Sequence, residues 1–510
     1  MYPTAAKVDQ LQESVVEGAL VFIPELVVCA GIILLLLSRL VRGMDRAHLG
    51  GLAMAVLFVA LFAAGFQVAE GKWGGSSFAN MLVSDSFAGL VRCLVLAATL
   101  ATVVLTLLSG IPDRDDSADF HVLLLGGALG MMLMASANHL LMVFIAVEMA
   151  SLPGYALAGF LKGKKTGSEA ALKYVVYGAG ASGVMLYGIT LLAGTFGSAY
   201  LPDVVAGVSA RGLDLPVLAG LTLVFVGLGF KLAAVPFHFW CPDVFEGAAA
   251  EVAGFLSVAS KAAAVALTTR LVLTLQAKLG GWSVPESLGV LVGVVGAITV
   301  TFGNLAACGQ TNLKRLLAYS TIAHAGYMLL AVALCNTAGA AAVLYYLAAY
   351  VVMNLGAFAV VALVRNATGG EGLAAFRGLA VRSPVLAVTM TVFLLSLLGL
   401  PPLAGFAGKF QVLEAVYDGA RAANTAGHAN LGAFFYVLLG VGALNTALSA
   451  YYYLRVVRAM LLEDSDGAAP IRSSPAAAAY LVALALALVA LGVLWNPLTA
   501  AAGRAISAFE

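Results

Sequence analysis

The sequence predicts an all-α polytopic membrane protein with about fourteen transmembrane helices, and two observations lead to this prediction. Of the 510 residues, 62% are apolar and only 10% are Asp, Glu, Lys or Arg, whereas about 25% of the residues of a soluble domain are charged. The apolar residues also form long continuous runs, and a bilayer core of about 30 Å needs roughly 20 of them per helix. A soluble globular enzyme and a disordered chain are therefore excluded.

The apolar runs fix the order of the expected helices. Residues 1–18 lack the basic stretch of a cleaved signal peptide, so we expect the first helix to be retained. The predicted helices cover residues 19–41, 48–69, 83–109, 120–136, 138–161, 170–194, 216–239, 249–275, 287–307, 313–334, 340–365, 384–417, 430–460 and 475–497.

Charge and cysteine content exclude several kinds of partner and cofactor. The formal net charge is +1, which predicts no affinity for nucleic acid. The five Cys residues are scattered without a CxxC pair, so they offer no disulfide framework, no zinc site and no set of iron–sulfur ligands. The sequence also lacks the GxxxxGK[ST] phosphate loop. We therefore expect the chain itself to bind no metal and no cofactor.

The loops predict how the protein is oriented. Lys and Arg are more than twice as frequent in the loops after odd-numbered helices as on the other side, and cytoplasmic loops are the ones enriched in these residues. An even number of helices places both termini on one side. We therefore expect both termini on the non-cytoplasmic side of the membrane.

Lysines deep within the predicted spans are the unusual feature of this sequence. A Lys at the centre of a membrane helix costs about 2.5–3.5 kcal/mol, and four lie at depth: Lys173, Lys231, Lys261 and Lys409. One interpretation is structural, with each amine paired to a carboxylate. Deep acids are scarcer than deep lysines, however, and Glu148 is the clearest of them. An amine short of partners in a low-dielectric site can exchange protons near neutrality.

Other charged residues in the spans have simpler interpretations. Lys173 follows Glu169 by one helical turn, so a plain intrahelical salt bridge is an equally good interpretation of that lysine. Arg92 and Arg270 lie near helix ends, where we expect their long side chains to reach the lipid headgroups. His238 and His324 also lie near helix ends. Each is a candidate proton relay, although a lone histidine is more often simply hydrogen-bonded.

Two helices are predicted to be broken beside a lysine. In GFKLAAVPFHFW (229–240), Pro236 removes a backbone donor soon after Lys231, and in LPPLAGFAGK (400–409) two prolines and two glycines precede Lys409. The breaks fall in helices 7 and 12, which are five apart, and an odd separation predicts two inverted repeats of the transporter kind. We therefore expect an N-terminal three-helix segment (1–110), repeats of helices 4–8 (111–280) and 9–13 (281–465), and a C-terminal helix 14 (466–510).

These segments resemble the antiporter-like proton-channel subunits of respiratory complex I, and subunit N of NADH–quinone oxidoreductase most of all. The resemblance lies in residues 147–153, 169–174, 230–243, 259–261, 310–327 and 400–409. It implies a proton relay in which Glu148 pairs with Lys231, Lys261 is the central carrier and Lys409 leads to the exit. Lys173, His238 and His324 are further candidates for that relay.

The resemblance also implies what lies outside the chain. NADH, FMN, the iron–sulfur clusters and quinone would be bound by other subunits of the complex. The expected surroundings are other membrane-arm subunits, the lipid bilayer, protons and water, in a bacterial inner membrane. A subunit of a multi-subunit cation/proton antiporter is the alternative, and a structural spacer whose lysines only brace helices is a more distant one.

Overall fold

The computed structural model describes residues 18–509, apart from 42–47, 72, 74, 79, 114–115, 162, 280–282 and 465–468. The prediction that the first helix is retained rests on residues 1–18, and nearly all of these lie outside the described residues. The first half of the described chain consists of α2 (Ile23–Ser38), α3 (Gly50–Glu70), β1 (Gly75–Ser77), β2 (Leu82–Ser84), α4 (Ser86–Ser109), α5 (Ser117–Ser136), α6 (Leu140–Ala158), α7 (Lys165–Phe196), α8 (Leu201–Arg211), α9 (Leu215–Leu232), α10 (Trp240–Gly247), α11 (Ala250–Phe255), the π-helix η2 (Leu256–Ser260) and α12 (Lys261–Leu279).

The second half is equally helical. It consists of α13 (Ser283–Cys308), α14 (Leu313–Val332), α15 (Thr337–Thr368), η3 (Leu373–Phe376), α16 (Leu379–Arg382), α17 (Pro384–Leu398), α18 (Ala404–Thr425), α19 (Ala429–Leu462), α20 (Pro475–Val493), α21 (Trp495–Ile506) and η4 (Ser507–Phe509). The strands β1 and β2 form one antiparallel hairpin with Ser76 opposite Val83.

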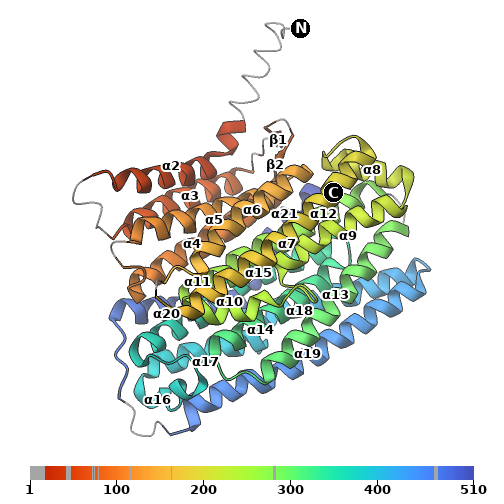
Figure 1. Cartoon of the computed structure of the whole chain (residues 1–510). Coiled ribbons are helices and arrows are strands. Elements are labelled where there is room, and N and C mark those ends of the chain that lie inside the picture. Colours follow the sequence, from red (N-terminus) through yellow and green to blue (C-terminus); the bar gives the residue numbers. More distant parts are fainter. Residues whose placement is uncertain are drawn as a thin grey trace.

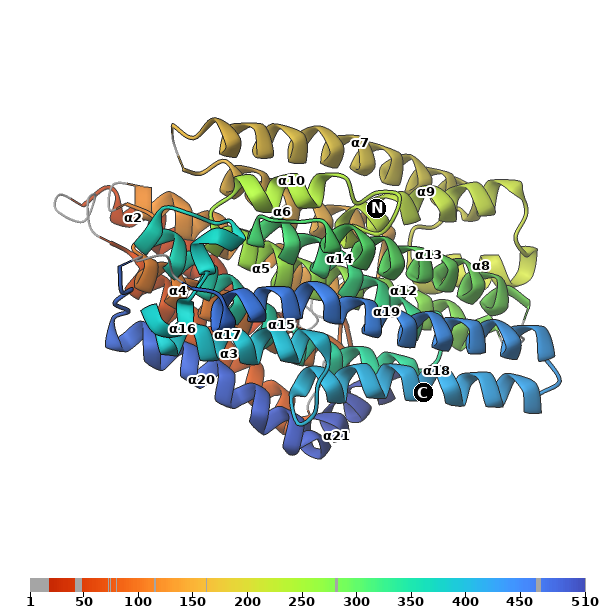
Figure 2. The same ribbon diagram turned by 90° about the horizontal axis from the view of Figure 1, so that it is seen from below.

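The helices form one bundle in which most axes run in the same direction (Figure 1). α2 and α3 lie at one edge and α19 at the opposite edge, and in the turned view α7 and α20 mark the other two borders (Figure 2). α15 lies in the interior, where it packs against α4, α11, α14, α17, α18, α20 and α21. Nearly all of its side chains are buried, so α15 is the element around which the two halves of the chain meet.

The predicted membrane architecture is confirmed in kind. Among the described residues, 11 helices are long and apolar enough to cross a membrane, and α2 and α17 are apolar but shorter. Each of the fourteen predicted ranges overlaps an observed helix. The number of crossings, the two inverted repeats and their boundaries stay predictions.

Three local features were not predicted. The region after α7 contains the short helix α8, whose Leu201, Val204 and Val208 are buried, although it is too short to register as an apolar span. The last predicted helix ends at Val493, and α21 follows it as a separate amphipathic helix. Helix 8, expected to be continuous, contains a π-helix immediately before Lys261. π-helices of this kind are frequent at functional sites.

The break in helix 7 is confirmed. α9 ends at Leu232, the next residue, Ala233, has φ +52°, and helix resumes only at Trp240. Pro236 lies within this interval, where it cannot donate a backbone hydrogen bond. The Leu232 carbonyl therefore lacks its usual helical partner, which would be the N–H of residue 236.

The break in helix 12 is also confirmed, and it depends on two glycines. α17 ends at Leu398 and α18 begins at Ala404. Gly399 has φ +92°, which side-chain-bearing residues rarely adopt. Gly405 approaches the end of α17 so closely that a Cβ atom would lie 1.7 Å from the carbonyl oxygen of Ser396. The two helix pieces meet only because these positions lack side chains.

Gly405→Ala should destabilise the protein, because the added methyl group must push α18 away from α17. Overpacking of this kind costs about 1–3 kcal/mol, and the thermal midpoint of the purified protein in detergent should fall accordingly. Gly440→Ala is the matched control, since nothing lies within 4 Å of the Cβ that it would add. Equal stability of the two variants would show that the close approach does not hold the break.

Candidate functional site

Three of the four predicted lysines are buried in the bundle. The exposed fraction is 0% for Lys231, 2% for Lys261 and 4% for Lys409. Lys231 lies in the last turn of α9, Lys261 begins α12 directly after the π-helix, and Lys409 lies in the second turn of α18. In the described part of the chain, no carboxylate forms an ion pair with any of these amines.

Two of these amines bind carbonyl oxygens that the helix breaks set free. Lys261 Nζ donates to the carbonyl of Leu232, the last residue of α9, over 2.6 Å. Lys409 Nζ donates to the carbonyl of Leu398, the last residue of α17, over 2.9 Å. Each ammonium also lies over an aromatic ring, with Lys261 5.3 Å from the Trp240 centroid and Lys409 4.7 Å from that of Tyr327. The two breaks therefore serve the same purpose in the two halves.

Lys231 is linked to α6 through a hydroxyl group. Its Nζ donates to Ser151 Oγ over 2.9 Å, and Ser151 Oγ donates to the Val147 carbonyl over 2.6 Å. Glu148, one turn before Ser151 on α6, accepts a short hydrogen bond from Ser182 of α7. The expected direct pair between Glu148 and Lys231 is not formed in this structure, because Ser151 takes the place of the carboxylate beside the amine.

Lys173 does not share the surroundings of the other three lysines. Its side chain is 38% exposed, and its amine binds Glu169 over 2.8 Å and Asp243 over 2.7 Å. Arg315 binds the other oxygen of Asp243 over 2.6 Å. The structural interpretation that the sequence left open is the one observed, and Lys173 joins α7 to α10 and α14 through this network.

The Asp243 carboxylate is the centre of that network. Partial burial acts to raise the pKa of the Asp243 carboxyl group, but hydrogen bonds from Lys173 and Arg315 outweigh it and hold this pKa below its usual range. The carboxylate is consequently charged throughout the physiological pH range.

His238 lies inside the break of helix 7. It is 3% exposed and packs between Phe239 and Phe302, with ring centroids 4.4 Å away in both cases. Its Nδ1 atom is buried without a hydrogen-bond partner. The predicted location near a helix end is confirmed, and no contact of this histidine with a lysine amine is seen.

His324 lies at the centre of a group of tyrosines. His324 was expected near a helix end, and this was wrong, because α14 continues past it to Val332 and the residue lies in the middle of the helix. It is 2% exposed; its Nδ1 is 2.6 Å from Tyr346 Oη and its Nε2 is 3.1 Å from Tyr453 Oη. Tyr327 and Tyr350 pack beside the imidazole, with centroids 6.2 and 5.3 Å away. Because Lys409 lies over the Tyr327 ring, His324 and its four tyrosines connect α14 and α15 to the second broken helix.

Sequence reasoning missed the polar residues of α15. Asn354 Nδ2 binds Ser257 Oγ of the π-helix over 2.9 Å and Tyr350 Oη over 2.8 Å. Tyr350 Oη in turn donates to Thr321 Oγ1 of α14 over 3.0 Å. A signal was present, because Tyr346, Tyr350 and Asn354 recur every four residues and therefore share one face of a helix.

This chain of hydroxyl and amide groups extends from the neighbourhood of Lys261 to His324. The Ser257 hydroxyl donates to the Gly254 carbonyl over 2.8 Å and accepts from Asn354 over 2.9 Å. Through this bond the π-helix is held to α15. The π-helix that precedes Lys261 is thus joined to α14 and α15 by polar groups in an otherwise apolar core.

The two arginines expected to reach the lipid headgroups are buried instead. Arg92, 2% exposed, forms an ion pair of 2.6 Å with the fully buried Glu25. Arg270 forms two hydrogen bonds of 2.9 and 2.8 Å with the Asp85 carboxylate. Each arginine pairs with a carboxylate from another segment, Glu25 of α2 or Asp85 just before α4, which the sequence pattern of a single span does not reveal.

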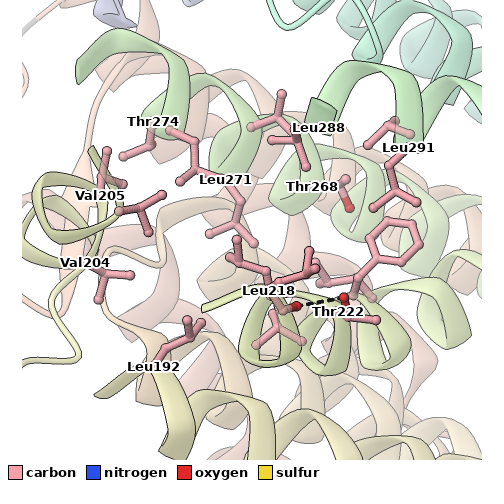
Figure 3. A pocket seen from close by; sticks show the side chains of 18 of the residues that line it. Leu192, Val204, Val205, Leu218, Thr222, Thr268, Leu271, Thr274, Leu288 and Leu291 are labelled. Carbon is pink, nitrogen blue, oxygen red and sulfur yellow. Dashed lines mark hydrogen bonds between the residues drawn. The ribbon is translucent and has the colours of Figure 1, made fainter. Parts of the chain in front are cut away.

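An apolar cavity of about 140 Å³ between α8, α9, α12 and α13 is separate from these polar groups (Figure 3). Its lining is almost wholly aliphatic. The threonines that line it donate to carbonyls of their own helices, as Thr222 does to Leu218 over 2.7 Å. Within the described residues, no cluster of three or more His, Cys, Asp or Glu is arranged to hold a metal ion.

Comparison with known proteins gives a consistent result. Residues 137–435 match the family described as NADH:quinone oxidoreductase/Mrp antiporter, TM. The chain is 40% identical over 502 residues to the NADH-quinone oxidoreductase subunit N of an Anaeromyxobacter species, covering 94% of this chain and 95% of that protein. It is also 40% identical over 504 residues to subunit N 2 from Sorangium cellulosum, covering 95% and 97% of the two chains.

Solved structures share the fold. A chain of respiratory complex I from Thermus thermophilus superposes with a TM-score of 0.76 at 35% identity, over 94% of this chain and 98% of that one. A chain of the Mrp complex from a Dietzia species superposes with a TM-score of 0.82 at 22% identity, over 96% and 97%. The second likeness concerns the fold alone.

Lys173→Ala should lower stability without stopping the chemistry of the buried lysines. The loss should be about 1 kcal/mol or less, because the pairs are partly exposed. The pKa of the Asp243 carboxyl group is lower in the folded protein than in the unfolded chain. The ion pairs of Asp243 therefore stabilise the fold fully at any pH above the unfolded-state pKa, and this stabilisation is lost only as the pH falls through the lower, folded-state pKa. The difference in thermal midpoint between wild type and variant should therefore stay constant between about pH 6 and pH 8. A difference that disappears within this interval would contradict the assignment.

Proposed function

The chain belongs to the NADH:quinone oxidoreductase/Mrp antiporter family of membrane subunits, and on that premise we propose that it carries protons across the membrane as subunit N of an NADH–quinone oxidoreductase. Relatives that carry this name match almost the whole chain. The observation that supports proton transport is the set of three buried amines, none of which forms an ion pair with a carboxylate among the described residues. Burial in a low-dielectric surrounding disfavours the charged form of an amine, so such groups gain and lose protons readily.

The contacts suggest an order for the relay. The amine of Lys261 binds the residue that follows Lys231, so the first two carriers are close together. From Lys261, the polar groups of the π-helix and of α15 lead to His324 and then, through the tyrosines around it, to Lys409. Lys173 and His238 contribute no contact to this order.

Glu148 would act on Lys231 through charge. A unit charge about 6 Å away changes the free energy of protonating an amine by roughly 3 kcal/mol at an effective dielectric constant of 20. Withdrawal of Glu148, or a change in the Ser151 hydrogen bond, would therefore suffice to drive a proton from Lys231 toward Lys261. Ser182, which binds Glu148, would set the position of the carboxylate.

The redox chemistry would take place outside this chain. We propose that NADH, FMN, the iron–sulfur clusters and quinone are bound by other subunits, and that neighbouring membrane-arm subunits transmit the driving signal. The protein would lie in a bacterial inner membrane among lipid, water and protons, with both termini on the non-cytoplasmic side. In this arrangement the chain contributes to the translocase without holding a redox centre.

A cation/proton antiporter subunit is the second candidate. The Mrp complex of Dietzia shares the fold, but its identity of 22% supports no functional transfer. Relatives 40% identical carry the oxidoreductase name, and this favours the first candidate. Purification of the native complex and identification of its subunits would decide between them.

Substitution of the central lysine separates proton transport from bracing. Lys261→Ala should reduce NADH-driven proton pumping in membrane vesicles by at least about tenfold, since a positioned proton-transfer group contributes about 10²–10⁴-fold. Lys261→Arg should fail as well, because a guanidinium keeps its charge and cannot pass its proton on.

The arginine variant is the informative one. If Lys261 only braced the end of α9, Arg would keep a cationic donor there and pumping would survive. The exposed Lys165 supplies the control, and Lys165→Ala should pump normally. Normal pumping and assembly in both Lys261→Ala and Lys261→Arg would end the relay proposal.

A further inference from the structure

A polar vestibule lies at the end of the bundle that carries the basic loops. It is a cavity of about 500 Å³ lined by Lys164, Glu246, Lys314, Arg365 and Glu371, among other residues. A second cavity of about 380 Å³ adjoins it, and Arg365 and Asn366 line both. The vestibule lies where α10 and α14 meet the end of α15, so residues from both halves of the chain contribute to its lining.

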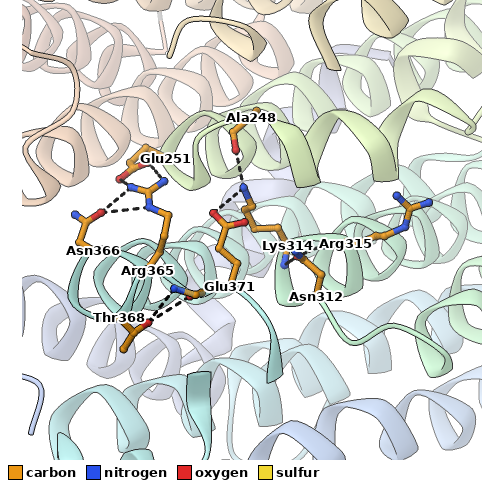
Figure 4. A network of polar contacts seen from close by, with 10 residues as sticks. Ala248, Glu251, Asn312, Lys314, Arg315, Arg365, Asn366, Thr368 and Glu371 are labelled. Carbon is orange, nitrogen blue, oxygen red and sulfur yellow. Dashed lines mark hydrogen bonds and ion pairs between the residues drawn. The ribbon is translucent and has the colours of Figure 1, made fainter. Parts of the chain in front are cut away.

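A buried ion pair lies at the inner end of this vestibule (Figure 4). Glu251, in the first turn of α11, is fully buried, and its carboxylate binds Arg365 over 3.1 Å. Arg365 also binds Asn366 over 2.9 Å. Lys314 fixes the neighbouring wall, because its amine binds Glu371 over 2.9 Å and the Ala248 carbonyl over 2.7 Å.

Glu251 and the central lysine are on the same helix. Ten residues separate Glu251 from Lys261, which corresponds to about 15 Å along a helix, or half of a bilayer core. On the facing side of α15, Arg365 and Asn354 are eleven residues apart and therefore share one face. Asn354 and Ser257, which bind each other, lie farther along these two elements, between the ion pair and the level of Lys261. Phe358 lies between Arg365 and Asn354 on the same face of α15 and is fully buried.

The other end of the same helix is closed. Nine residues beyond Lys261, Arg270 binds both oxygens of Asp85 and the Ala135 carbonyl. Its guanidinium lies 5.0 and 5.2 Å from the centroids of Phe87 and Phe509. A bidentate pair covered by two aromatic rings leaves little room for water, whereas the pair at the vestibule borders a polar cavity.

We infer that the Glu251–Arg365 pair is the proton-uptake gate of this chain, through which protons pass from the vestibule toward Lys261. This inference rests on the proposed proton transport and assigns its entrance. The Glu251 carboxylate would accept a proton from a hydronium ion of the vestibule, leaving water, and the neutral acid would bind Arg365 more weakly. Internal water molecules would then carry that proton to the neutral amine of Lys261, which becomes an ammonium group as the Glu251 carboxylate forms again. The carboxylate then returns to Arg365, so each proton taken up leaves the gate unchanged.

The first test removes both charges of the gate. Glu251→Gln alone leaves Arg365 buried without a counter-ion and can prevent assembly, so the double variant Glu251→Gln/Arg365→Gln is used in the assembled complex. Proton pumping by inside-out vesicles should fall about tenfold or more, while Glu251→Asp should retain part of it with an increased solvent deuterium isotope effect on turnover. Glu463→Gln, which alters a carboxylate paired with Arg377 over 3.0 Å outside the vestibule, should pump normally.

These outcomes separate the gate from the proposed function. If Lys261→Ala abolishes pumping but the assembled double variant pumps at the wild-type rate, the gate is wrong and the relay stands. If the Lys261→Ala variant itself pumps protons normally, the proposed proton transport is wrong, whatever the double variant does. A merely structural Glu251 would give a slower Glu251→Asp enzyme with an unchanged isotope effect, and this result would also overturn the inference.

A second test concerns access to the vestibule. Ala249 lines the cavity two residues before Glu251, so a membrane-impermeant maleimide should label Ala249→Cys in inside-out vesicles and not in intact spheroplasts. Wild-type complex, with its five native cysteines, gives the background. Labelling from the outer side alone would overturn the assignment of the entrance.

Discussion

Hydrogen bonds between buried amines and freed carbonyls are the interactions on which this structure depends. A broken helix leaves carbonyl oxygens without partners inside a membrane, and a buried amine lacks the water that it would otherwise bind. The amines of Lys261 and Lys409 each donate a hydrogen bond to the carbonyl of the last residue of a broken helix, so that the amine and the carbonyl both gain a partner. The break and the lysine therefore require each other, and a proton that leaves the amine weakens the contact that holds the break.

Three carboxylates of the interior are bound by arginines, and among the described residues no carboxylate forms an ion pair with Lys231, Lys261 or Lys409. Glu25 binds Arg92, Asp85 binds Arg270, and Glu251 binds Arg365. An arginine stays protonated in proteins and holds a carboxylate through a fixed planar fork. The pairs of Arg92 and Arg270 brace the bundle, whereas the pair of Arg365 borders the vestibule. The three lysine amines are left in contact with a hydroxyl, carbonyls and aromatic rings.

α15 joins the two halves of the molecule. It is long and almost wholly buried, and it presents a face on which polar residues alternate with an aromatic one. The tyrosines of this face contact His324, its asparagine contacts the π-helix, and its arginine contacts Glu251. All three contacts are made by residues of one helix, so a change of charge at one of them acts on the helix that holds the other two. α15 is therefore suited to couple events at the two broken helices.

The sequence by itself determined the membrane class, the order of the helices, both breaks and the buried lysines. These features follow from runs of apolar residues and from proline and glycine, whose effects act over a few neighbouring residues. Only the tertiary structure decided which groups the lysines contact. Ser151 rather than Glu148 adjoins Lys231, Lys173 lies in a half-exposed network, and Arg92 and Arg270 are paired inside. Such contacts join residues on different helices, and the periodicity of one span carries no information about the side chains of its neighbours.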